Sequence, residues 1–296
     1  MVPAAERKAL LFGVNVPTSA TPGSDPVGQG VRAEALGFDF VSSSDHPCGT
    51  EPSHETWTML SWIAAGTSTI QIATRVLGVP YRNPAMTAKM AETFDRLSGG
   101  RLILGLGAGA SDEEFRAFGL PVNSMRDKIT GLEEAVWIAR GLWTKRIFTL
   151  YGQVHSTENA PMEPKPTGRI PIWLGTFGPR ALAVTGRVAD GWIPSLGHAP
   201  AEELEPMRQR VMSAAEEAGR DRTAITCALN VEARVDEGAA SRTNGLTGAP
   251  DVVVERILGF VDKGFTAFNF MPIGPRPEDQ AERLAREVIP AVRAAL

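Results

Sequence analysis

Two adjacent residues in the N-terminal third of the chain combine a carboxylate with an imidazole. Asp45 and His46 follow the apolar run Phe38–Val41, in the segment SSSDH. A histidine titrates near neutral pH, so at the end of a strand it can donate or accept a proton during a reaction. A helix-capping aspartate beside a structural histidine fits the same pattern equally well. His46 is therefore the candidate catalytic residue, but the pair alone does not define a reaction.

A second candidate site is the turn GTFG, which comes directly before Pro179 and an expected helix. Proline at the first helical position leaves the preceding backbone N–H groups free, and the helix dipole favours a negative charge there. An ordinary strand-to-helix turn has the same composition. The sequence therefore predicts a phosphate-binding turn formed by Gly175, Thr176, Phe177 and Gly178.

Small residues also follow the apolar run Arg101–Leu106. The sequence continues with Gly107, Ala108, Gly109 and Ala110, and then with the acidic segment SDEEF. The segment formally matches a dinucleotide-binding fingerprint, G-x-G-x-x-A. However, it follows a fourth strand and not a first one, and the acidic residues after it disfavour a pyrophosphate. We therefore expect these positions to let a ligand approach the backbone closely, without a dinucleotide fold.

Charge and metal-ligand spacing exclude several classes of function. The net charge is −4, which gives no general field for binding nucleic acid. No pair of histidines has a spacing typical of metal ligands, so we expect no metal site. The histidines are His46, His54, His155 and His198.

The chain has the composition of a globular protein of the cytoplasm. Apolar residues make up 43% and charged residues 22% of its 296 residues. Two distant cysteines, Cys48 and Cys227, form no disulfide framework, which favours a reducing compartment. The N-terminal segment lacks the pattern of a signal peptide, and no apolar run is long enough to span a bilayer. We expect a cytoplasmic protein that does not bind membranes.

The elements that must position these residues alternate between strand and helix. Short apolar runs predict strands at Leu10–Val16, Phe38–Val41, Ile70–Val79, Arg101–Leu106, Ile172–Leu174, Gly191–Ile193, Ala224–Ala233 and Ala267–Phe270. Amphipathic periodicity predicts helices at Gly28–Leu36, Glu55–Thr67, Ala85–Leu97, Asp127–Trp143, Pro179–Arg187, Ala201–Glu217, Val252–Lys263 and Glu278–Ala295.

Eight strand–helix units in a chain of this length predict an α/β fold, a single (β/α)8 TIM barrel spanning residues 1–296. A doubly wound open sheet is the alternative. Segment Ile147–Met162 is expected to be an inserted hairpin, Asp112–Phe118 a small helix, and Ala239–Pro250 a loop. Active sites of such barrels lie where the strands end, and this rule selects the post-strand positions described above.

Residues 37–192 resemble the luciferase-like superfamily of flavin and deazaflavin oxidoreductases, in particular its coenzyme F420-dependent branch. The resemblance lies in GFDFVSSSDHP, in ATRVLGVPYRNPAMTAKMAETFDRLSGGRLILGLGAG, in DEEFRAFGLP with the later LEEAVWIARGLW, and in IPIWLGTFGPRALAVTGRVADGW. The combination of DRLSGGR, G-x-G-x-G and a later ADGW is specific. The last third of the chain matches only in its barrel periodicity.

The resemblance implies a luciferase-like barrel, with loop insertions at its C-terminal face, that holds F420 or a flavin at this mouth. Asp45 would contact the deazaflavin ring and His46 would be the active-site histidine. A cis peptide at Arg75–Val76 would support the ring from behind. Gly107, Ala108 and Gly109 would pass beside the cofactor, and the turn Gly175–Gly178 would bind its phosphate.

Two positions depart from better-known relatives. F420-dependent sugar-phosphate dehydrogenases carry a glutamate at the position of Ala110, so its absence argues against that reaction. Luciferase carries a phosphate-binding arginine at the position of Ala108, so its absence weakens the case for FMN. The resemblance therefore favours coenzyme F420 over FMN as the cofactor.

The expected function is hydride transfer between coenzyme F420 and a small apolar organic substrate, with His46 handling a proton. One alternative is an FMN-dependent monooxygenase that uses reduced flavin and oxygen. Another is a flavin- or deazaflavin-binding barrel without turnover. The resemblance also implies a homodimer paired through helices near Trp57 and Trp62, and a separate flavin or F420 reductase as a partner.

Overall fold

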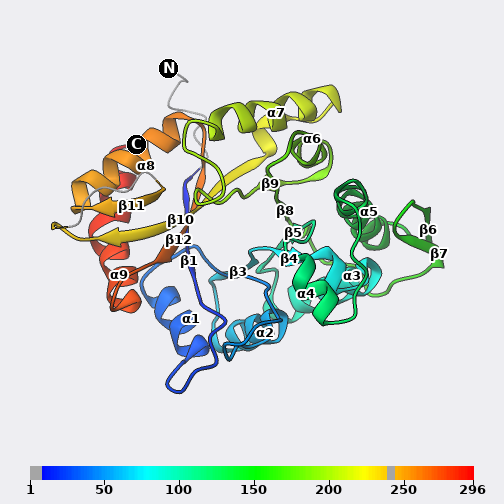
Figure 1. Cartoon of the computed structure of the whole chain (residues 1–296), viewed down its shortest axis with the longest axis horizontal. Helices are drawn as coiled ribbons and strands as arrows, with labels where there is room; N and C mark the ends of the chain where they lie inside the picture. The colour runs from blue at the N-terminus through cyan, green and yellow to red at the C-terminus, as the bar shows by residue number, and fades with distance from the viewer. Residues whose placement is uncertain (1–8, 239–243) are drawn as a thin grey trace.

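The computed structural model describes residues 9–238 and 244–296, and in it eight parallel strands close into a barrel (Figure 1). Each strand pairs with the next, and pairing between β9 and β10 closes the ring. This arrangement confirms the predicted (β/α)8 barrel. The barrel strands, in order around the ring, are β1 (Leu11–Asn15), β2 (Phe40–Ser43), β3 (Gln71–Thr74), β5 (Leu102–Gly107), β8 (Ile172–Gly175), β9 (Gly191–Trp192), β10 (Thr226–Val235) and β12 (Ala267–Pro272).

Helices surround the strands, and the capping residues explain where several of them begin. Asp25, Glu55, Asn83 and Ser124 each accept hydrogen bonds from backbone N–H groups in the first turn of the helix that follows. The larger helices are α1 (Pro26–Ala35), α2 (Thr56–Gly66), α3 (Pro84–Ser98), α5 (Met125–Thr144), α6 (Pro179–Val188), α7 (Leu204–Glu217) and α8 (Pro250–Asp262).

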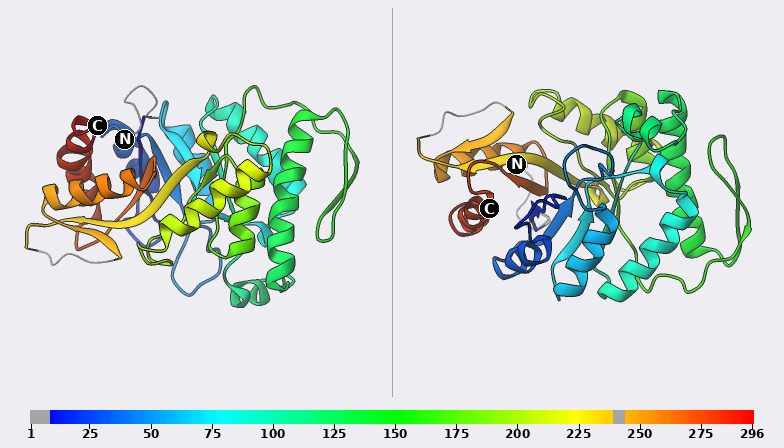
Figure 2. Two further views of the ribbon diagram at one scale, coloured as in Figure 1. Left: turned by 90° about the horizontal axis from the view of Figure 1, so that it is seen from above. Right: turned by 60° about the horizontal axis from the view of Figure 1, so that its bottom comes forward.

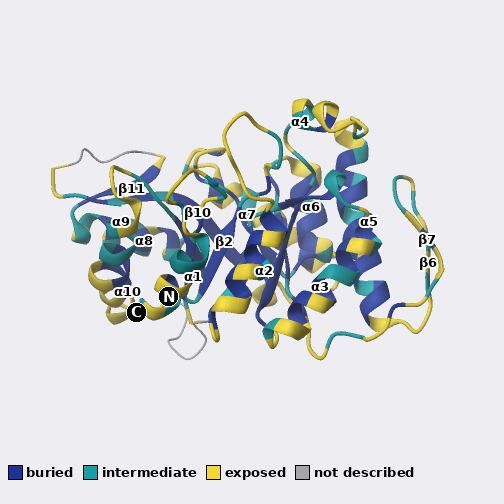
Figure 3. Ribbon diagram, turned by 90° about the horizontal axis from the view of Figure 1, so that it is seen from below, coloured by how far each residue is buried: buried dark blue, intermediate teal, exposed yellow. Residues whose placement is uncertain are grey.

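Alternate residues of each strand point into the barrel or out toward the helices. The inward residues form a compact apolar layer that includes Phe40, Ala73, Ile103 and Trp173. The outward residues join the helices in a much larger core. Figure 3 shows the strands as buried, with exposed residues concentrated on the outer helix faces and the loops. Both faces of each barrel strand are covered, which explains why the barrel strands read as mostly apolar runs without regular alternation.

The segment DRLSGGR connects α3 to β5, and its last residue, Arg101, forms hydrogen bonds with the end of α2. Gly99 and Gly100 both have positive φ angles, at +74° and +87°, which only glycine adopts without strain. The buried guanidinium of Arg101 then donates to the backbone oxygens of Ala64, Thr67 and Ile70. This signature segment therefore stabilises the fold at the N-terminal end of β5 and does not reach the barrel mouth.

Three expected elements differ from the structure. The predicted third strand, Ile70–Val79, is split into β3 and the short β4 (Leu77–Gly78). The expected loop Ala239–Pro250 contains β11 (Gly245–Gly248), which pairs with the end of β10, while residues 239–243 lie outside the described part. The final helix is interrupted, because Pro290 has no N–H to donate. Its parts are α9 (Pro277–Arg283), a π-helical turn η4 (Leu284–Val288) and α10 (Ile289–Ala294).

The predicted hairpin is confirmed and lies outside α5, away from the barrel (Figure 2). It consists of β6 (Phe148–Tyr151) and β7 (Ser156–Ala160) in antiparallel pairing. The buried carboxylate of Glu134 on α5 accepts hydrogen bonds from the backbone N–H groups of Gln153, Val154 and His155. In the described residues, no helix combines the length and the apolarity needed to cross a bilayer.

Candidate active site

A polar layer covers the apolar interior of the barrel where the strands end. Ser42 Oγ donates to Asn269 Oδ1 at 2.8 Å, Asn269 Nδ2 donates to Asn230 Oδ1 at 2.7 Å, and Asn230 Nδ2 donates to Ser195 Oγ at 2.8 Å. These residues belong to β2, β12, β10 and the loop after β9. Because each buried amide is oriented by its neighbours, this layer forms a rigid polar floor for the mouth of the barrel.

The break in the third strand lies beside this floor, at a cis peptide bond between Arg75 and Val76. Just before it, Thr74 Oγ1 donates to Gly105 O at 2.8 Å and accepts from Gly105 N at 2.7 Å. The side chain of Thr74 thus replaces the backbone pairing that β3 and β5 would otherwise make. The chain resumes as β4, which pairs with the last residues of β5.

Val76 explains why the strand ends next to it are glycines. A Cβ atom at Gly107 would lie 2.6 Å from Val76 Cγ2, and one at Gly175 would lie 3.2 Å from the same atom. Contacts near 2.6 Å are too short for real carbon atoms, so a side chain at Gly107 would displace Val76. Cis Arg75–Val76, Gly107 and Gly175 therefore form one continuous wall of small residues and backbone.

Asp45 is buried and its carboxylate is occupied by protein groups. Arg82 donates to both carboxylate oxygens, at 2.7 and 3.1 Å, and the backbone N–H of Gly78 donates at 3.0 Å. Arg82 also pairs with Glu55, which caps α2. This arrangement ties the loop after β2 to β4 and the start of α2. The expected contact between Asp45 and a cofactor ring stays a prediction.

His46 lies at the mouth, where its exposed ring meets an acidic residue that follows β5. Its Nδ1 is 3.0 Å from Glu114 Oε1, and the hydroxyl of Tyr81 donates to the other oxygen of the same carboxylate. Burial and this bond to Glu114 raise the pKa of Tyr81, so its hydroxyl stays protonated as a donor. The carboxylate of Glu114 therefore fixes the orientation of the His46 ring and leaves Nε2 available.

Glu114 is carried by the short helix α4 (Asp112–Ala117), which is docked over the barrel mouth, uppermost in Figure 3. Phe115 of this helix is fully buried, and a Cβ atom at Gly109 would lie 2.5 Å from its ring. Gly109 also has φ of +89°. The buried Lys128 pairs with Asp112 and holds the helix from α5. Gly109 is therefore needed to seat α4, a role in addition to the expected cofactor contact.

The turn after β8 leaves the N-terminus of α6 open. Gly178 is the N-cap residue, and no side chain caps the first turn of the helix. A Cβ atom at Gly178 would meet nothing within 4 Å. The side chain of Thr176 is buried, and its hydroxyl lies 2.7 Å from the Thr185 hydroxyl. The Thr176 hydroxyl therefore points away from the turn. Phe177 packs against His198, with ring centroids 5.6 Å apart. The backbone N–H groups at the uncapped start of α6, together with the open space in front of them, fit a phosphate group.

The structure brings most of the predicted site residues to one mouth but also reveals others. Arg75, Val76, Gly107 and Gly175 share one wall, His46 lies above it, and Ala108 is partly buried at the exit of β5. Tyr81 and Arg82 follow the third strand, so the rule that sites lie where strands end selects them, but the sequence assigned them no role. Glu114 was treated only as one of several acidic residues, because nothing in the sequence shows that α4 folds back over His46. Among the described residues, no group of three or more His, Cys, Asp or Glu side chains is arranged to hold a metal ion.

Comparison with known proteins identifies the family. A model of the luciferase-like monooxygenases matches residues 10–244. The chain belongs to the luciferase-like monooxygenase family. One relative in this family is an F420-dependent glucose-6-phosphate dehydrogenase from Microbacterium testaceum (strain StLB037), 27% identical over 96% of this chain and 98% of the relative. Another is a 5,10-methylenetetrahydromethanopterin reductase from Methanolobus tindarius, 30% identical over 76% of this chain and 68% of that one.

Solved structures of this luciferase-like type share the barrel. An F420-dependent secondary alcohol dehydrogenase in complex with an F420-acetone adduct superposes with a TM-score of 0.84, over 97% of this chain and all of the other, at 21% identity. A monooxygenase from Streptomyces bottropensis gives a TM-score of 0.82 at 22% identity, over 95% of this chain and 99% of the other. At these identities the likeness establishes the fold.

Proposed function

We propose that this luciferase-like barrel is an oxidoreductase that transfers a hydride between coenzyme F420 and a small organic substrate. The observation that carries the proposal is the His46–Glu114 pair, which stands at the mouth next to the wall formed by Val76 and Gly107. Relatives that extend over most of the chain are named as F420-dependent dehydrogenases. The substrate class of those relatives is not assumed for this chain.

The residues present fit a cofactor with a flat ring and a phosphate. The backbone N–H groups of Gly175–Gly178 and the N-terminus of α6 would hold the phosphate, since the helix end is uncapped and open. Val76 and Gly107 would lie behind the ring, where a larger residue at Gly107 has no space. Coenzyme F420, when bound, supplies a carbon that accepts or gives the hydride, and the protein supplies binding and orientation.

His46 would exchange a proton with the substrate oxygen through Nε2. Because Glu114 accepts at Nδ1, the imidazole is held in one orientation, which leaves Nε2 to face the substrate. The Tyr81 hydroxyl completes the set by donating to Glu114. The chain has no carboxylate at Ala110, and the carboxylate that contacts His46 is that of Glu114.

The proposal is tested by offering F420 and a panel of alcohols, aldehydes, ketones and sugar phosphates, and following the visible absorbance of the deazaflavin. We expect turnover with at least one substrate class and its loss in His46→Ala, with cofactor binding unchanged. Oxygen uptake with reduced FMN, and no reaction of F420, would establish the monooxygenase instead. Cofactor binding without turnover in either assay would indicate that the protein binds a flavin or deazaflavin without catalysing a reaction.

The FMN alternative carries a requirement of its own. A monooxygenase of this type needs a separate reductase to supply reduced flavin, whereas a dehydrogenase reduces F420 with its own substrate. If the reaction ran from reduced F420 to substrate, an F420 reductase would be needed instead. Adding each reductase to the assay separates these cases by showing which reduced cofactor the protein consumes.

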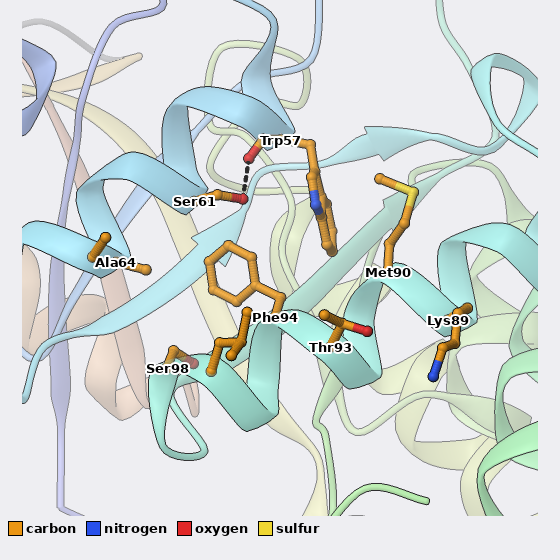
Figure 4. A pocket seen from close by; sticks show the side chains of 10 residues that line it. Trp57, Ser61, Ala64, Lys89, Met90, Thr93, Phe94 and Ser98 are labelled. Carbon is orange, nitrogen blue, oxygen red and sulfur yellow. Dashed lines mark hydrogen bonds between the residues drawn. The ribbon is translucent and has the colours of Figure 1, made fainter. Parts of the chain in front are cut away.

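A homodimer is proposed from the outer face of α2 and α3. Helix α2 contains no charged residue, yet the side chain of Trp62 is 69% exposed. On α3, Leu97 is 83% exposed. Between the two helices lies an apolar cavity of about 350 Å³, with Trp57 and Phe94 on its walls (Figure 4). A surface helix without charge is unusual for a monomer, and a second copy of this chain is the partner that matches its apolar face.

Sedimentation velocity tests the dimer. We expect the wild type to sediment as a dimer and Trp62→Glu to sediment as a folded monomer, because a buried unpaired charge opposes association. Trp137→Glu is the matched control, since Trp137 is also partly exposed but lies on α5. A monomeric wild type, or a dimer unaffected by Trp62→Glu, would contradict this assignment.

We also propose that the protein works in the cytoplasm. Both cysteines, Cys48 and Cys227, are free thiols, as expected in a reducing compartment. Fractionation of the source cells, followed by immunodetection, would find it with cytoplasmic markers. Recovery with a secreted or membrane fraction would contradict this assignment.

A further inference from the structure

One cation at the barrel mouth has no acidic partner among the described residues. The guanidinium of Arg75 makes a single hydrogen bond there, from Nη2 to Asn15 Oδ1 at 3.1 Å. Its Nε is buried without any partner. Burial lowers the pKa of Arg75 to about 10, with no neighbouring carboxylate contributing, so the group is still charged at neutral pH.

Two other largely buried cations near the mouth have acidic partners. Arg82 is bound by Asp45 and Glu55, and Lys128 is bound by Asp112. Leaving a charge desolvated and without a counter-ion costs free energy, so a protein keeps such a group where a ligand supplies the opposite charge. Arg75 therefore differs from its neighbours in the way expected of a binding residue.

The position of Arg75 also points to a ligand inside the mouth. On β1, Asn15 is paired in register with Ser42 of β2, and Ser42 with Ala73 of β3. Ala73 faces the barrel interior, so Arg75, two residues later, lies on the same inward face. Its side chain crosses above Ser42 to reach Asn15, which places the guanidinium directly over the polar floor.

The distance around the barrel separates this cation from the phosphate-binding turn. The ring order β1, β2, β3, β5, β8 puts β1 and β8 on opposite sides of the barrel. A cofactor phosphate at Gly178 and an anion at Arg75 and Asn15 are thus different groups. His46 leaves the barrel from β2, the strand between Asn15 and Arg75, so a ligand group at Arg75 lies on the histidine's side of the mouth.

We propose that Arg75 and Asn15 bind an anionic oxygen group of the substrate, a carboxylate or a phosphate, and so select an anionic substrate. The inference rests on the proposed function and deepens it, since it names the substrate class of the same site. Arg75 would bind through Nη1 and the second N–H of Nη2, in the paired geometry that guanidinium groups offer to such anions. This class differs from the apolar substrate expected from the sequence.

The test compares two probes of equal size, acetate and acetamide, together with inorganic phosphate. Binding to protein with and without F420 is measured by calorimetry, and F420 affinity is measured separately in the same samples. The variants are Arg75→Met, which removes the charge at similar length, and Arg75→Lys, which keeps it. Arg116→Met is the control, because it removes an equal charge from the exposed side of α4.

We expect the wild type to prefer acetate and phosphate over acetamide by roughly tenfold. Arg75→Met should abolish this preference, Arg75→Lys should keep part of it, and Arg116→Met should leave it unchanged. Because the charge of Arg75 has no acidic partner among the described residues, Arg75→Met should not lower the melting temperature. Failure of the wild type to bind F420 would refute the proposed function. The preference for acetate over acetamide is also measured without F420, so it tests the anion site separately.

Four results would overturn the inference. The first is an equal affinity of the wild type for acetate and acetamide, and the second is an anion preference that survives in Arg75→Met. The third is a loss of F420 affinity in Arg75→Met with the acetate preference intact, which would show that Arg75 contacts the cofactor instead of an anionic substrate. The fourth is a melting temperature lowered by several degrees in Arg75→Met, which would show that Arg75 has a structural role.

Discussion

His46 Nδ1 lies 3.0 Å from Glu114 Oε1, which joins the loop after β2 to a helix that follows β5. The contact depends on α4 folding back over the mouth, and Phe115 and Lys128 hold it there. The histidine is exposed, whereas the carboxylate is mostly buried. The pair is thus an exposed proton-exchanging imidazole oriented by a fixed acceptor, which is an arrangement suited to proton transfer at the edge of a cofactor site.

Replacing Glu114 should lower the rate without weakening cofactor binding. In Glu114→Gln the amide can still accept a hydrogen bond, but it no longer stabilises a charged imidazole. We expect kcat to fall roughly tenfold or more, because acid–base catalysis contributes about a hundredfold or more. The double variant with His46→Ala should be no slower than His46→Ala alone. Additive losses in steady-state kinetics would show that the two residues act separately.

A side chain at Gly178 should weaken cofactor binding while the protein stays folded. The Cβ atom would meet no protein atom within 4 Å, so Gly178→Val adds bulk only to the space in front of α6. We expect the dissociation constant for F420 to rise about tenfold, equivalent to roughly 1.4 kcal/mol. Gly168→Val, at another open glycine, should change nothing. Equal F420 affinities of Gly178→Val and Gly168→Val in a fluorescence titration would show that the cofactor phosphate does not bind at this turn.

Gly109→Ala should destabilise the helix over the mouth. The residue has φ of +89°, and its new methyl group would lie 2.5 Å from Phe115. We expect unfolding by urea to be easier by about 2–3 kcal/mol. Gly119→Ala has φ of +69° but open space around it, so it should cost only about 1 kcal/mol. Indistinguishable losses would mean that Phe115 adapts to the added methyl group.

Glu34 should contribute stability that is lost in acid. Its carboxylate accepts from the backbone N–H groups of Thr69, Ile70 and Ser68, and these bonds lower its pKa from 4.5 to about 2. A lowered folded-state pKa stabilises the protein above pH 4.5, and this contribution disappears as the pH falls toward 2. After allowance for solvent screening, the contribution is about 1 kcal/mol.

Urea unfolding at several pH values checks this. Glu34→Gln should lose stability at pH 7, and the difference from the wild type should shrink as the pH falls from 4.5 toward 2. Glu202→Gln, at an exposed carboxylate, is the control. A difference that does not change with pH would show that the charge of Glu34 is not what stabilises the loop between α2 and β3.

The sequence was sufficient for the barrel because strand–helix alternation is a local pattern. It also predicted a phosphate-binding turn at Gly178 and a candidate histidine, since barrel sites lie where strands end. The pairing of His46 with Glu114 was not predictable, because it depends on how α4 packs. The engagement of Asp45 by Arg82 was missed for the same reason: a sequence motif does not reveal which neighbours occupy a carboxylate.

The split of the third strand illustrates another limit. The run Ile70–Val79 is rich in apolar and β-branched residues and contains no turn signal before Gly78, so the sequence pattern predicts one strand there. The break follows from contacts across strands, where Thr74 bonds to Gly105 and Val76 fills the space left by Gly107. Only the resemblance to the luciferase-like family pointed to the cis bond at Arg75–Val76. The extent of the domain and the roles of the cofactor-binding residues stay predictions.

Parallel titrations of the protein with F420 and FMN test whether this barrel holds the deazaflavin cofactor at the Gly178 turn. We expect saturable F420 binding at micromolar or lower concentration, weakened about tenfold in Gly178→Val and unchanged in Gly168→Val. FMN should bind more weakly than F420. Tight FMN binding with no F420 binding would show that F420 is not the cofactor, and F420 affinity unchanged in Gly178→Val would show that the cofactor does not bind at this turn.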